Sequence, residues 1–211
     1  MDKIICIGKN YLEHARELGD AVPDKPVIFL KPPSTLKQAS AWGSSVQAVF
    51  PEGESDVHPE CEIVFRIAKD GYRLALQEAD DFIDGITIGL DMTLRSRQAQ
   101  LKKAGHPWTT SKVFLDAAII GPWIQPYADF MQTKFSLSLD NHITQKAIGA
   151  EMMMKPVELL VYVSHFFPLC KGDLVFTGTP VGVKAISSET KAVLRWDDKA
   201  FFVEWGKANP P

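Results

Sequence analysis

Short apolar runs rich in β-branched residues, separated by glycine, proline and polar turns, are the feature that most restricts the fold of this sequence. Runs of roughly four to eight such residues are typical of β-strands. They do not alternate regularly with helical segments, which argues against a doubly wound parallel sheet. The pattern predicts a mixed α+β fold that is predominantly β, with a few peripheral helices.

The expected elements follow from periodicity and turn residues. Strands are predicted at Lys3–Ile7, Val27–Leu30, Cys61–Ala68, Gly85–Leu90, Lys112–Leu115, Ala118–Ile124, Lys134–Leu139, Ile143–Ile148, Leu174–Thr177, Ala192–Trp196 and Phe201–Trp205. Helical segments are predicted at Asn10–Leu18, with Asn10 as its cap, and at Asp80–Ile83, Met92–Ala104 and Pro156–His165. The stretch Lys31–Asp56 is rich in proline, serine and glycine, and it is predicted to be a long surface loop.

Length and charge limit the classes of protein to consider. The 211 residues suit one domain, so residues 1–211 are expected to fold as a unit. A net charge of −3 gives no electrostatic footprint for nucleic acid. We find no secretion signal and no membrane-spanning stretch, and therefore expect a cytoplasmic protein without a membrane partner. Cys6, Cys61 and Cys170 are widely spaced and are expected to be buried, reduced thiols.

Two acids open one of the apolar runs, and a third acid interrupts another. Glu60 and Glu62 are two residues apart, so on a strand they share one face. Like charges held that close favour a divalent cation with oxygen ligands, such as Mg²⁺ or Mn²⁺, although the exposed face of an edge strand is the plainer alternative. Asp91, inside Gly85–Thr93, is either a third ligand for that ion or the N-cap of the helix that follows.

A histidine and a lysine are further candidates for catalysis. His14 and Glu17 are three residues apart on the first predicted helix, so the carboxylate can orient the imidazole as a general base. A charged helix surface would need no such role. Lys112 opens a predicted strand and could balance an anionic intermediate, or it could simply extend its ammonium into solvent at the strand end.

Two other groups suit the binding of a carboxylate. Arg95 and Gln98 are three residues apart on the second long helix and could grip an anionic group, although the same helix face could be merely solvated. Thr177, Gly178 and Thr179 form a turn with hydroxyl and backbone N–H donors, which could hold an anion or be an ordinary β-turn.

Taken together, these segments resemble the fumarylacetoacetate hydrolase family, in particular its small single-domain members. The resemblance rests on motifs that occur in one order along nearly the whole chain: Gly8-Lys9-Asn10-Tyr11 with His14 and Glu17, Pro26–Pro32, Glu60-x-Glu62, Leu90-Asp91-Met92-Thr93 with Arg95 and Gln98, Lys112 with Phe114, Gly121-Pro122, and Gly172-Asp173 through Thr177–Pro180. The chain departs from the family pattern at Ala150–Met154 and at Val181–Lys184, which could reshape the pocket or a subunit contact.

The resemblance implies a mixed β-sandwich roll with few helices, formed as a homodimer. It implies a Mg²⁺ or Mn²⁺ ion held by Glu60, Glu62 and Asp91, and a lid that carries His14 and Glu17. The expected reaction is hydrolysis of a C–C bond in a 2,4-dioxo acid such as an acylpyruvate, through a pyruvate enolate held by the ion. Oxaloacetate decarboxylation and isomerisation of 2-hydroxyhepta-2,4-diene-1,7-dioate are the alternatives within the family, and a non-catalytic oligomeric binding protein is the alternative outside it.

Overall fold

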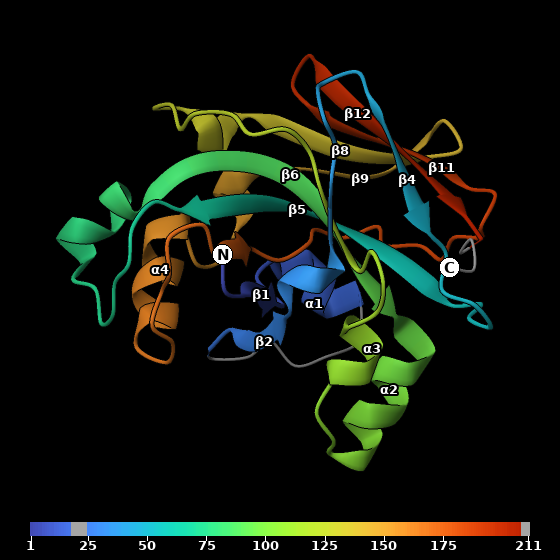
Figure 1. The fold of residues 1–211 in the computed structure, drawn as a ribbon, viewed down its shortest axis with the longest axis horizontal. Coiled ribbons are helices and arrows are strands. Elements are labelled where there is room, and N and C mark those ends of the chain that lie inside the picture. The colour runs from blue at the N-terminus through green and yellow to red at the C-terminus, as the bar shows by residue number, and fades with distance from the viewer. Residues whose placement is uncertain (18–24, 208–211) are drawn as a thin grey trace.

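The strands of the computed structural model form two β-sheets with helices at their periphery (Figure 1). The structure describes residues 1–17 and 25–207. The larger sheet has seven strands in the order β2 (Val27–Lys31), β1 (Ile4–Gly8), β10 (Leu174–Phe176), β5 (Val57–Ile67), β6 (Ile83–Leu94), β7 (Ala118–Ile120) and β3 (Leu36–Gln38). The smaller sheet has five strands in the order β4 (Ser45–Val49), β12 (Lys199–Gly206), β11 (Lys191–Trp196), β8 (Lys134–Leu139) and β9 (His142–Ile148).

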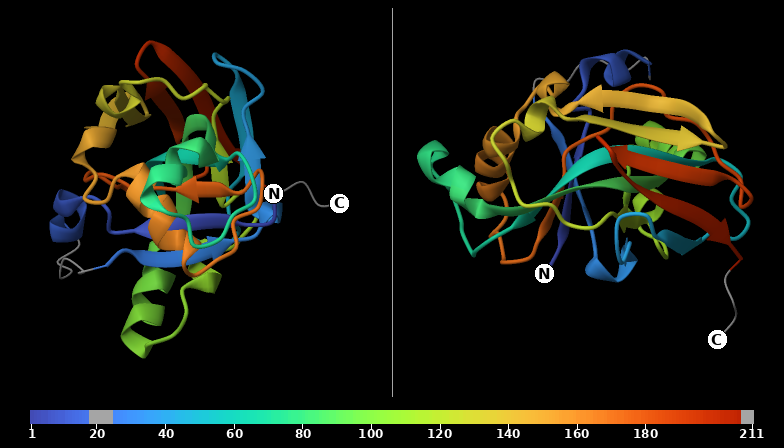
Figure 2. Two further views of the ribbon diagram at one scale, coloured as in Figure 1. Left: turned by 90° about the vertical axis from the view of Figure 1, so that its left-hand side faces the viewer. Right: turned by 90° about the horizontal axis from the view of Figure 1, so that it is seen from above.

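The helices are short and lie outside the sheets, as the two further views in Figure 2 show for α2 and α4. The α-helices are α1 (Leu12–Glu17), α2 (Arg95–Ala104), α3 (Thr109–Lys112) and α4 (Pro156–Ser164). Single turns of 3₁₀ helix occur at η1 (Pro33–Thr35), η3 (Phe130–Gln132) and η4 (Gly149–Glu151), and η2 (Leu76–Phe82) is longer. In the part of the chain that the structure describes, none of the helices has the length and apolar character needed to cross a membrane. The predicted mixed α+β, predominantly β fold is confirmed.

The antiparallel pair of β5 and β6 forms the centre of the larger sheet and runs across the middle of the molecule (Figure 1). Nearly every residue of both strands is buried, so both faces of this hairpin are covered. Its register places Glu60 directly opposite Asp91, and Glu62 opposite Gly89. Glu60, Glu62 and Asp91 therefore lie in the interior of the protein.

The main hydrophobic core lies between the two sheets. It joins Phe65 of β5 and Ile88 of β6 to Phe135 of β8, Leu194 of β11 and Phe201 of β12, all of which are fully or almost fully buried. The smaller sheet alternates buried and exposed positions along β11, as expected for a sheet with one face in the core. This packing fixes the central hairpin, and with it the acidic residues that the hairpin carries.

Two predictions about the first part of the chain were wrong. The predicted loop at Lys31–Asp56 contains β3 and β4, which pair in parallel with β7 and β12. These strands are short and gain their hydrogen bonds from partners far away in the sequence, which a local pattern does not reveal. Asn10 does not cap a helix through its side chain, because its amide bonds to Met154 and Thr177 instead. The predicted end of that helix, Leu18, lies outside the described residues.

The segment around Asp91 and Lys112 also differs from prediction. Strand β6 continues to Leu94, because it pairs with β5 as far as Val57, and α2 begins only at Arg95. Asp91 therefore lies within a strand and is not an N-cap. Lys112 ends the helical turn α3 and does not open a strand. Its ammonium group is bound to the buried carboxylates of Glu60 and Asp91.

Among the cysteines, Cys6 and Cys61 are buried as expected. Cys170 is only partly buried, because the turn that carries it lies at the edge of the fold, where Lys3 Nζ is 3.8 Å from its sulfur. The prediction that all three thiols are buried was therefore wrong for Cys170.

Candidate metal centre and active site

Three carboxylates meet inside the protein beside the central hairpin. Glu60 and Glu62 of β5 and Asp91 of β6 each offer an oxygen, and these oxygens lie within 4.8 Å of one another. The three residues are only 5%, 2% and 1% exposed. Because ionised carboxylates are costly to bury alone, such a cluster requires cations.

Three side chains supply positive charge to two of these carboxylates. Lys112 Nζ lies 2.9 Å from Glu60 Oε2 and 2.6 Å from Asp91 Oδ2. Lys31 Nζ lies 2.6 Å from Asp91 Oδ1, and Arg95 donates to Glu60 Oε1. Burial would raise the pKa of Glu60, but Lys112 and Arg95 outweigh it and hold that pKa well below its ordinary value. Asp91 Oδ1 is in ion-pair range of Lys31 yet has no aligned hydrogen bond within the described part of the chain.

Glu62 is held differently. Its Oε2 accepts a 2.7 Å hydrogen bond from the backbone N–H of Gly178. Burial, together with the neighbouring charges of Asp91 and Glu60, raises the pKa of Glu62 well above its ordinary value. A third negative charge is thus disfavoured at this point unless another cation is present. Carboxylate oxygens are the ligands that Mg²⁺ and Mn²⁺ prefer, so the residues present fit such an ion.

The turn at Thr177–Thr179 is fastened to β5. The Thr177 hydroxyl donates to the carbonyl of Ile63 (2.9 Å), and the Thr179 hydroxyl donates to the carbonyl of Cys61 (2.8 Å). Gly178 has a φ of +98°, and a Cβ there would lie 2.8 Å from Asn10 Cβ, so a larger residue is excluded. Thr179 lines the chamber beside the carboxylates, whereas the donors of Thr177 and Gly178 are used within the protein.

The pair on α1 reaches the same chamber. His14 is only 4% exposed, and its Nδ1 lies 3.0 Å from Glu17 Oε2. The backbone N–H of Gly182 donates to Glu17 Oε1 at 3.1 Å. The structure therefore brings together the histidine, its carboxylate and the acidic cluster, with the turn after β10 holding the carboxylate from the other side.

Arg95 and Gln98 line the chamber opposite α1. Arg95 Nη1 donates to Gln98 Oε1 at 2.7 Å, and Gln98 is buried. The Nε atom of Arg95 is buried and has no hydrogen-bond partner among the described residues. This donor is therefore not used by the part of the protein that the structure describes.

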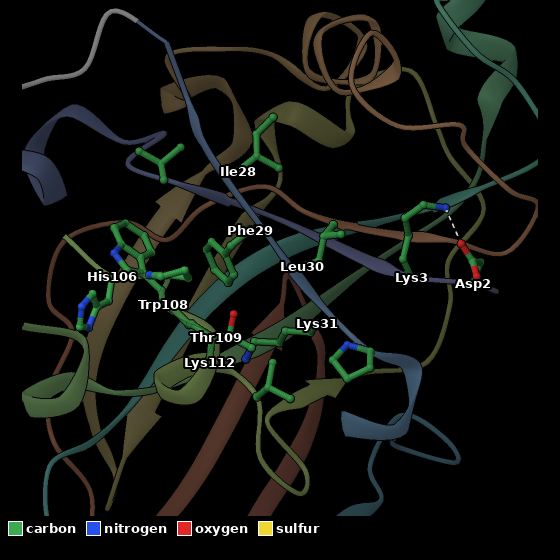
Figure 3. Close-up of a pocket in the computed structure, with 14 residues that line it drawn as sticks. Asp2, Lys3, Ile28, Phe29, Leu30, Lys31, His106, Trp108, Thr109 and Lys112 are labelled. Atoms are coloured by element: carbon green, nitrogen blue, oxygen red, sulfur yellow. Dashed lines mark hydrogen bonds and ion pairs between the residues drawn. The ribbon is translucent and has the colours of Figure 1, made fainter. Parts of the chain in front are cut away.

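The chamber itself is small and adjoins a larger groove. Its volume is about 30 Å³. The neighbouring groove has about 730 Å³ and lies between β2 and the segment that leads into α3 (Figure 3). Phe29, Trp108 and Lys112 line both spaces.

Sequence reasoning missed several residues of this site. Lys31 ends an apolar strand, and that position is the only signal of its burial against Asp91. Gln145 is buried and bonds through its amide to Thr179 and Pro180 and through its carbonyl to Cys61 N–H. It lies on a strand of the other sheet, so nothing local in the sequence indicates this contact.

Comparisons with known proteins give a family, several relatives and similar solved structures. The family model described as fumarylacetoacetate (FAA) hydrolase C-terminal matches residues 3–207. An oxaloacetate tautomerase of Escherichia coli is 34% identical over 201 residues, which are 93% of this chain and 89% of the relative. A mitochondrial oxaloacetate tautomerase of Caenorhabditis elegans is 37% identical. The match spans 88% of this chain and 86% of that relative.

A solved structure is similar over almost the whole fold. The crystal structure of fumarylpyruvate hydrolase from Pseudomonas aeruginosa in complex with Mn²⁺ and pyruvate is 32% identical, with a TM-score of 0.88. The similarity covers 97% of this chain and 90% of that one. The chain belongs to the fumarylacetoacetate hydrolase family.

Proposed function

We propose that this protein is a Mg²⁺- or Mn²⁺-dependent hydrolase that cleaves a C–C bond in 2,4-dioxo acids such as acylpyruvates. The observation that carries the proposal is the His14–Glu17 pair, which lines the same chamber as the three buried carboxylates. A general base beside a divalent-ion site is what the addition of water to a carbonyl requires.

Glu60, Glu62 and Asp91 would hold the ion. When bound, the ion would act as a Lewis acid on the 2-oxo group and align the substrate. The Thr177–Thr179 turn serves the site mainly by fixing Glu62, because the Gly178 N–H binds that carboxylate.

Arg95 and Gln98 supply the donors for the substrate carboxylate, and Thr179 faces it from the turn. The unpaired Nε of Arg95 is one such donor. Because the guanidinium is planar and always charged, it orients a carboxylate as well as attracting it.

Proton transfer begins at His14. Its imidazole takes a proton from water while Glu17 fixes the orientation of the ring. The hydroxide adds to the carbonyl at C4, and the C3–C4 bond then breaks. The products are a carboxylic acid from the acyl group and the enolate of pyruvate, which takes up at C3 the proton that His14 removed from water. Lys112 keeps its ammonium beside the developing negative charge.

Oxaloacetate tautomerisation or decarboxylation is the second candidate. It is favoured by the activities named for the relatives in Escherichia coli and Caenorhabditis elegans. These reactions also pass through an enol or enolate of a 2-oxo acid, but they need no added water. Tautomerisation still needs a base that moves a proton at C3, which His14 could also supply, so the substrate that is turned over separates the two candidates.

The test is a substrate panel with His14→Ala and, as a matched control, His142→Ala on the exposed start of β9. The panel holds acetopyruvate, oxaloacetate and 2-hydroxyhepta-2,4-diene-1,7-dioate, each with Mg²⁺ or Mn²⁺. We expect acetopyruvate hydrolysis by the wild type, a loss of about 10²- to 10⁴-fold in His14→Ala, and no loss in His142→Ala.

Three outcomes would contradict the hydrolase proposal. Full hydrolysis by His14→Ala would remove the general base from the mechanism. Turnover of oxaloacetate without any of acetopyruvate would assign the second candidate. Inactivity toward the whole panel, with the ion bound, would favour a non-catalytic binding protein.

A further inference from the structure

The outer edge of β5 has no strand beside it where β5 carries two of the three carboxylates. Strand β10 pairs with β5 only as far as Val64, which lies opposite Phe176. Beyond that point, the N–H and C=O groups of Cys61, between Glu60 and Glu62, bond to side chains and not to a neighbouring strand. These side chains therefore determine the position of the backbone between the two carboxylates.

Gln145 of β9 makes these bonds directly and through a threonine. It is 1% exposed, and its Oε1 accepts a hydrogen bond from the N–H of Cys61 at 3.0 Å. Its Nε2 donates to the Thr179 hydroxyl at 2.8 Å and to the carbonyl of Pro180 at 2.7 Å. The Thr179 hydroxyl in turn donates to the Cys61 carbonyl at 2.8 Å. One amide thus uses both of its N–H donors and helps to fix both polar groups of the Cys61 backbone.

A β-bulge directs Gln145 to this place. On β9, Gln145 lies opposite Leu137 of β8. Ile143 lies opposite the next residue, Ser138, so Thr144 is an extra residue in β9. A bulge interrupts the alternation of side chains and re-aims the residues beside it. Ile143 is consequently exposed, whereas Gln145, two residues later, points into the protein.

The same amide holds the turn that binds Glu62. This turn contains Gly178, whose N–H donates to Glu62 Oε2 at 2.7 Å. Gln145 therefore fixes both the strand that carries Glu62 and the turn that binds its carboxylate. Mg²⁺ requires nearly ideal octahedral geometry with oxygens at about 2.0–2.1 Å, whereas Ca²⁺ accepts irregular geometry at about 2.3–2.6 Å. Precise placement of the carboxylates thus matters more for Mg²⁺ than for Ca²⁺.

We propose that Gln145 is a positioning residue for the divalent ion, because it holds Glu60 and Glu62 in the arrangement that a small ion such as Mg²⁺ requires. It is not among the residues that line the chamber, and it acts through the backbone and the turn to which it bonds. The inference rests on the ion site of the proposed function and not on the reaction that follows.

The test compares Mg²⁺ and Ca²⁺ affinity in Gln145→Met, which keeps the length of the side chain and removes its hydrogen bonds. Both dissociation constants are measured by titration calorimetry on the full chain. We expect Mg²⁺ affinity to fall about 10- to 100-fold, as is typical when a group that orients a ligand is lost, and Ca²⁺ affinity to fall by about threefold or less. A variant whose fold is merely loosened would lose affinity for both ions by similar factors.

The matched control is Gln47→Met in the same sheet. Gln47 is exposed on β4 and bonds through its amide to the Glu204 carboxylate at 3.0 Å. This variant loses a glutamine hydrogen bond of the same kind outside the chamber, so we expect wild-type affinity for both ions.

Thr179→Val is the second variant. It keeps the shape of the side chain and removes the hydroxyl that links the amide to the Cys61 carbonyl, so Mg²⁺ affinity should fall about 3- to 10-fold, with a smaller loss for Ca²⁺. Thermal unfolding in EDTA shows which variants are folded at the assay temperature. Thr179→Val carries the test if Gln145→Met is unfolded there.

Equal losses of Mg²⁺ and Ca²⁺ affinity, or no loss of either, would overturn the role of Gln145. Acetopyruvate turnover by the wild type is measured in parallel to separate the two proposals. A selective loss of Mg²⁺ affinity in the variants of a protein that does not hydrolyse acetopyruvate would refute the hydrolase and keep the role of Gln145. Hydrolysis by the wild type, with ion affinities that the substitutions leave unchanged, would do the reverse. A wild type that binds neither ion would refute both.

Discussion

Glu62 and Glu60 should respond in opposite ways to loss of their charge when no divalent ion is bound. We consider the substitutions Glu62→Gln and Glu60→Gln, which keep the shape of the side chain. Glu62 is bound by a backbone N–H, and its pKa is raised by burial and by Asp91 and Glu60. The pKa of Glu60 is lowered, because Lys112 and Arg95 outweigh its burial.

The magnitude follows from the separation of the carboxylates. Two like charges no more than 4.8 Å apart repel by at least about 3 kcal/mol at an effective dielectric constant of about 20. Glu62 has two such neighbours, and the cations around Glu60 and Asp91 offset much of that repulsion. We therefore expect Glu62→Gln to stabilise the metal-free protein by about 1–2 kcal/mol, which is a rise in melting temperature of about 2–8 °C for a chain of this size. Glu60→Gln should destabilise it by about 3–5 kcal/mol, because Lys112 and Arg95 lose a buried partner.

The pH dependence has a definite sign. The pKa of Glu62 is raised above its ordinary value of 4.5, so between these two values the folded state binds more protons than the unfolded state. The stability of the metal-free wild type should therefore fall as the pH rises above about 4.5, and Glu62→Gln should remove part of that fall.

The assay is thermal unfolding in EDTA and in excess Mg²⁺. An ion at about one hundred times its dissociation constant stabilises the wild type by about 2.7 kcal/mol, and both variants should lose most of that gain. The reasoning would be refuted if Glu62→Gln were less stable than the wild type in EDTA. It would also be refuted if either variant kept the full response to Mg²⁺.

Two further predictions concern contacts outside the carboxylate cluster. Asp173→Asn should cost about 2–4 kcal/mol at neutral pH, because Asp173 is fully buried, pairs with Lys3 and accepts backbone N–H bonds that lower its pKa despite burial. Since that pKa lies below its ordinary 3.8, the difference between wild type and variant in urea unfolding should shrink as the pH falls below about 4. Gly182→Ala should reduce acetopyruvate turnover and cost about 1–3 kcal/mol in the same unfolding assay, because a Cβ there would lie 1.9 Å from the Thr144 carbonyl oxygen and displace the N–H that holds Glu17. Wild-type stability of Asp173→Asn, or wild-type stability and turnover of Gly182→Ala, would contradict the corresponding contact.

Local patterns in the sequence predicted the parts of the fold that depend on local chemistry. Acids inside apolar runs marked Glu60, Glu62 and Asp91, because a carboxylate among β-branched residues is too costly to leave without a role. The spacing of His14 and Glu17 likewise predicted a contact that forms within one helical turn. In both cases the information lies within a few residues.

What could not be predicted depends on contacts between distant segments. Strand β4 is held by parallel pairing with β12, and Lys31 is buried only because β2 brings it beside Asp91 of β6. The helical turn α3 ends at Lys112, which the apolar residues that follow it had assigned to a strand. These features become visible only once the sheet order is known, because each partner is supplied by another part of the chain.

The charges of the site explain why an ion and an anionic substrate belong together. Three carboxylates face three cationic side chains, Lys31, Lys112 and Arg95, so the chamber is formally neutral once Glu62 has lost its proton. A divalent ion would leave it with two positive charges in a buried space, where an uncompensated charge is costly. The carboxylate of an oxo acid, together with the negative charge that develops at its 2-oxo oxygen, restores neutrality. The protein thus balances its charge most completely when the substrate is becoming an enolate, which is the condition for stabilising that state more than the ground state.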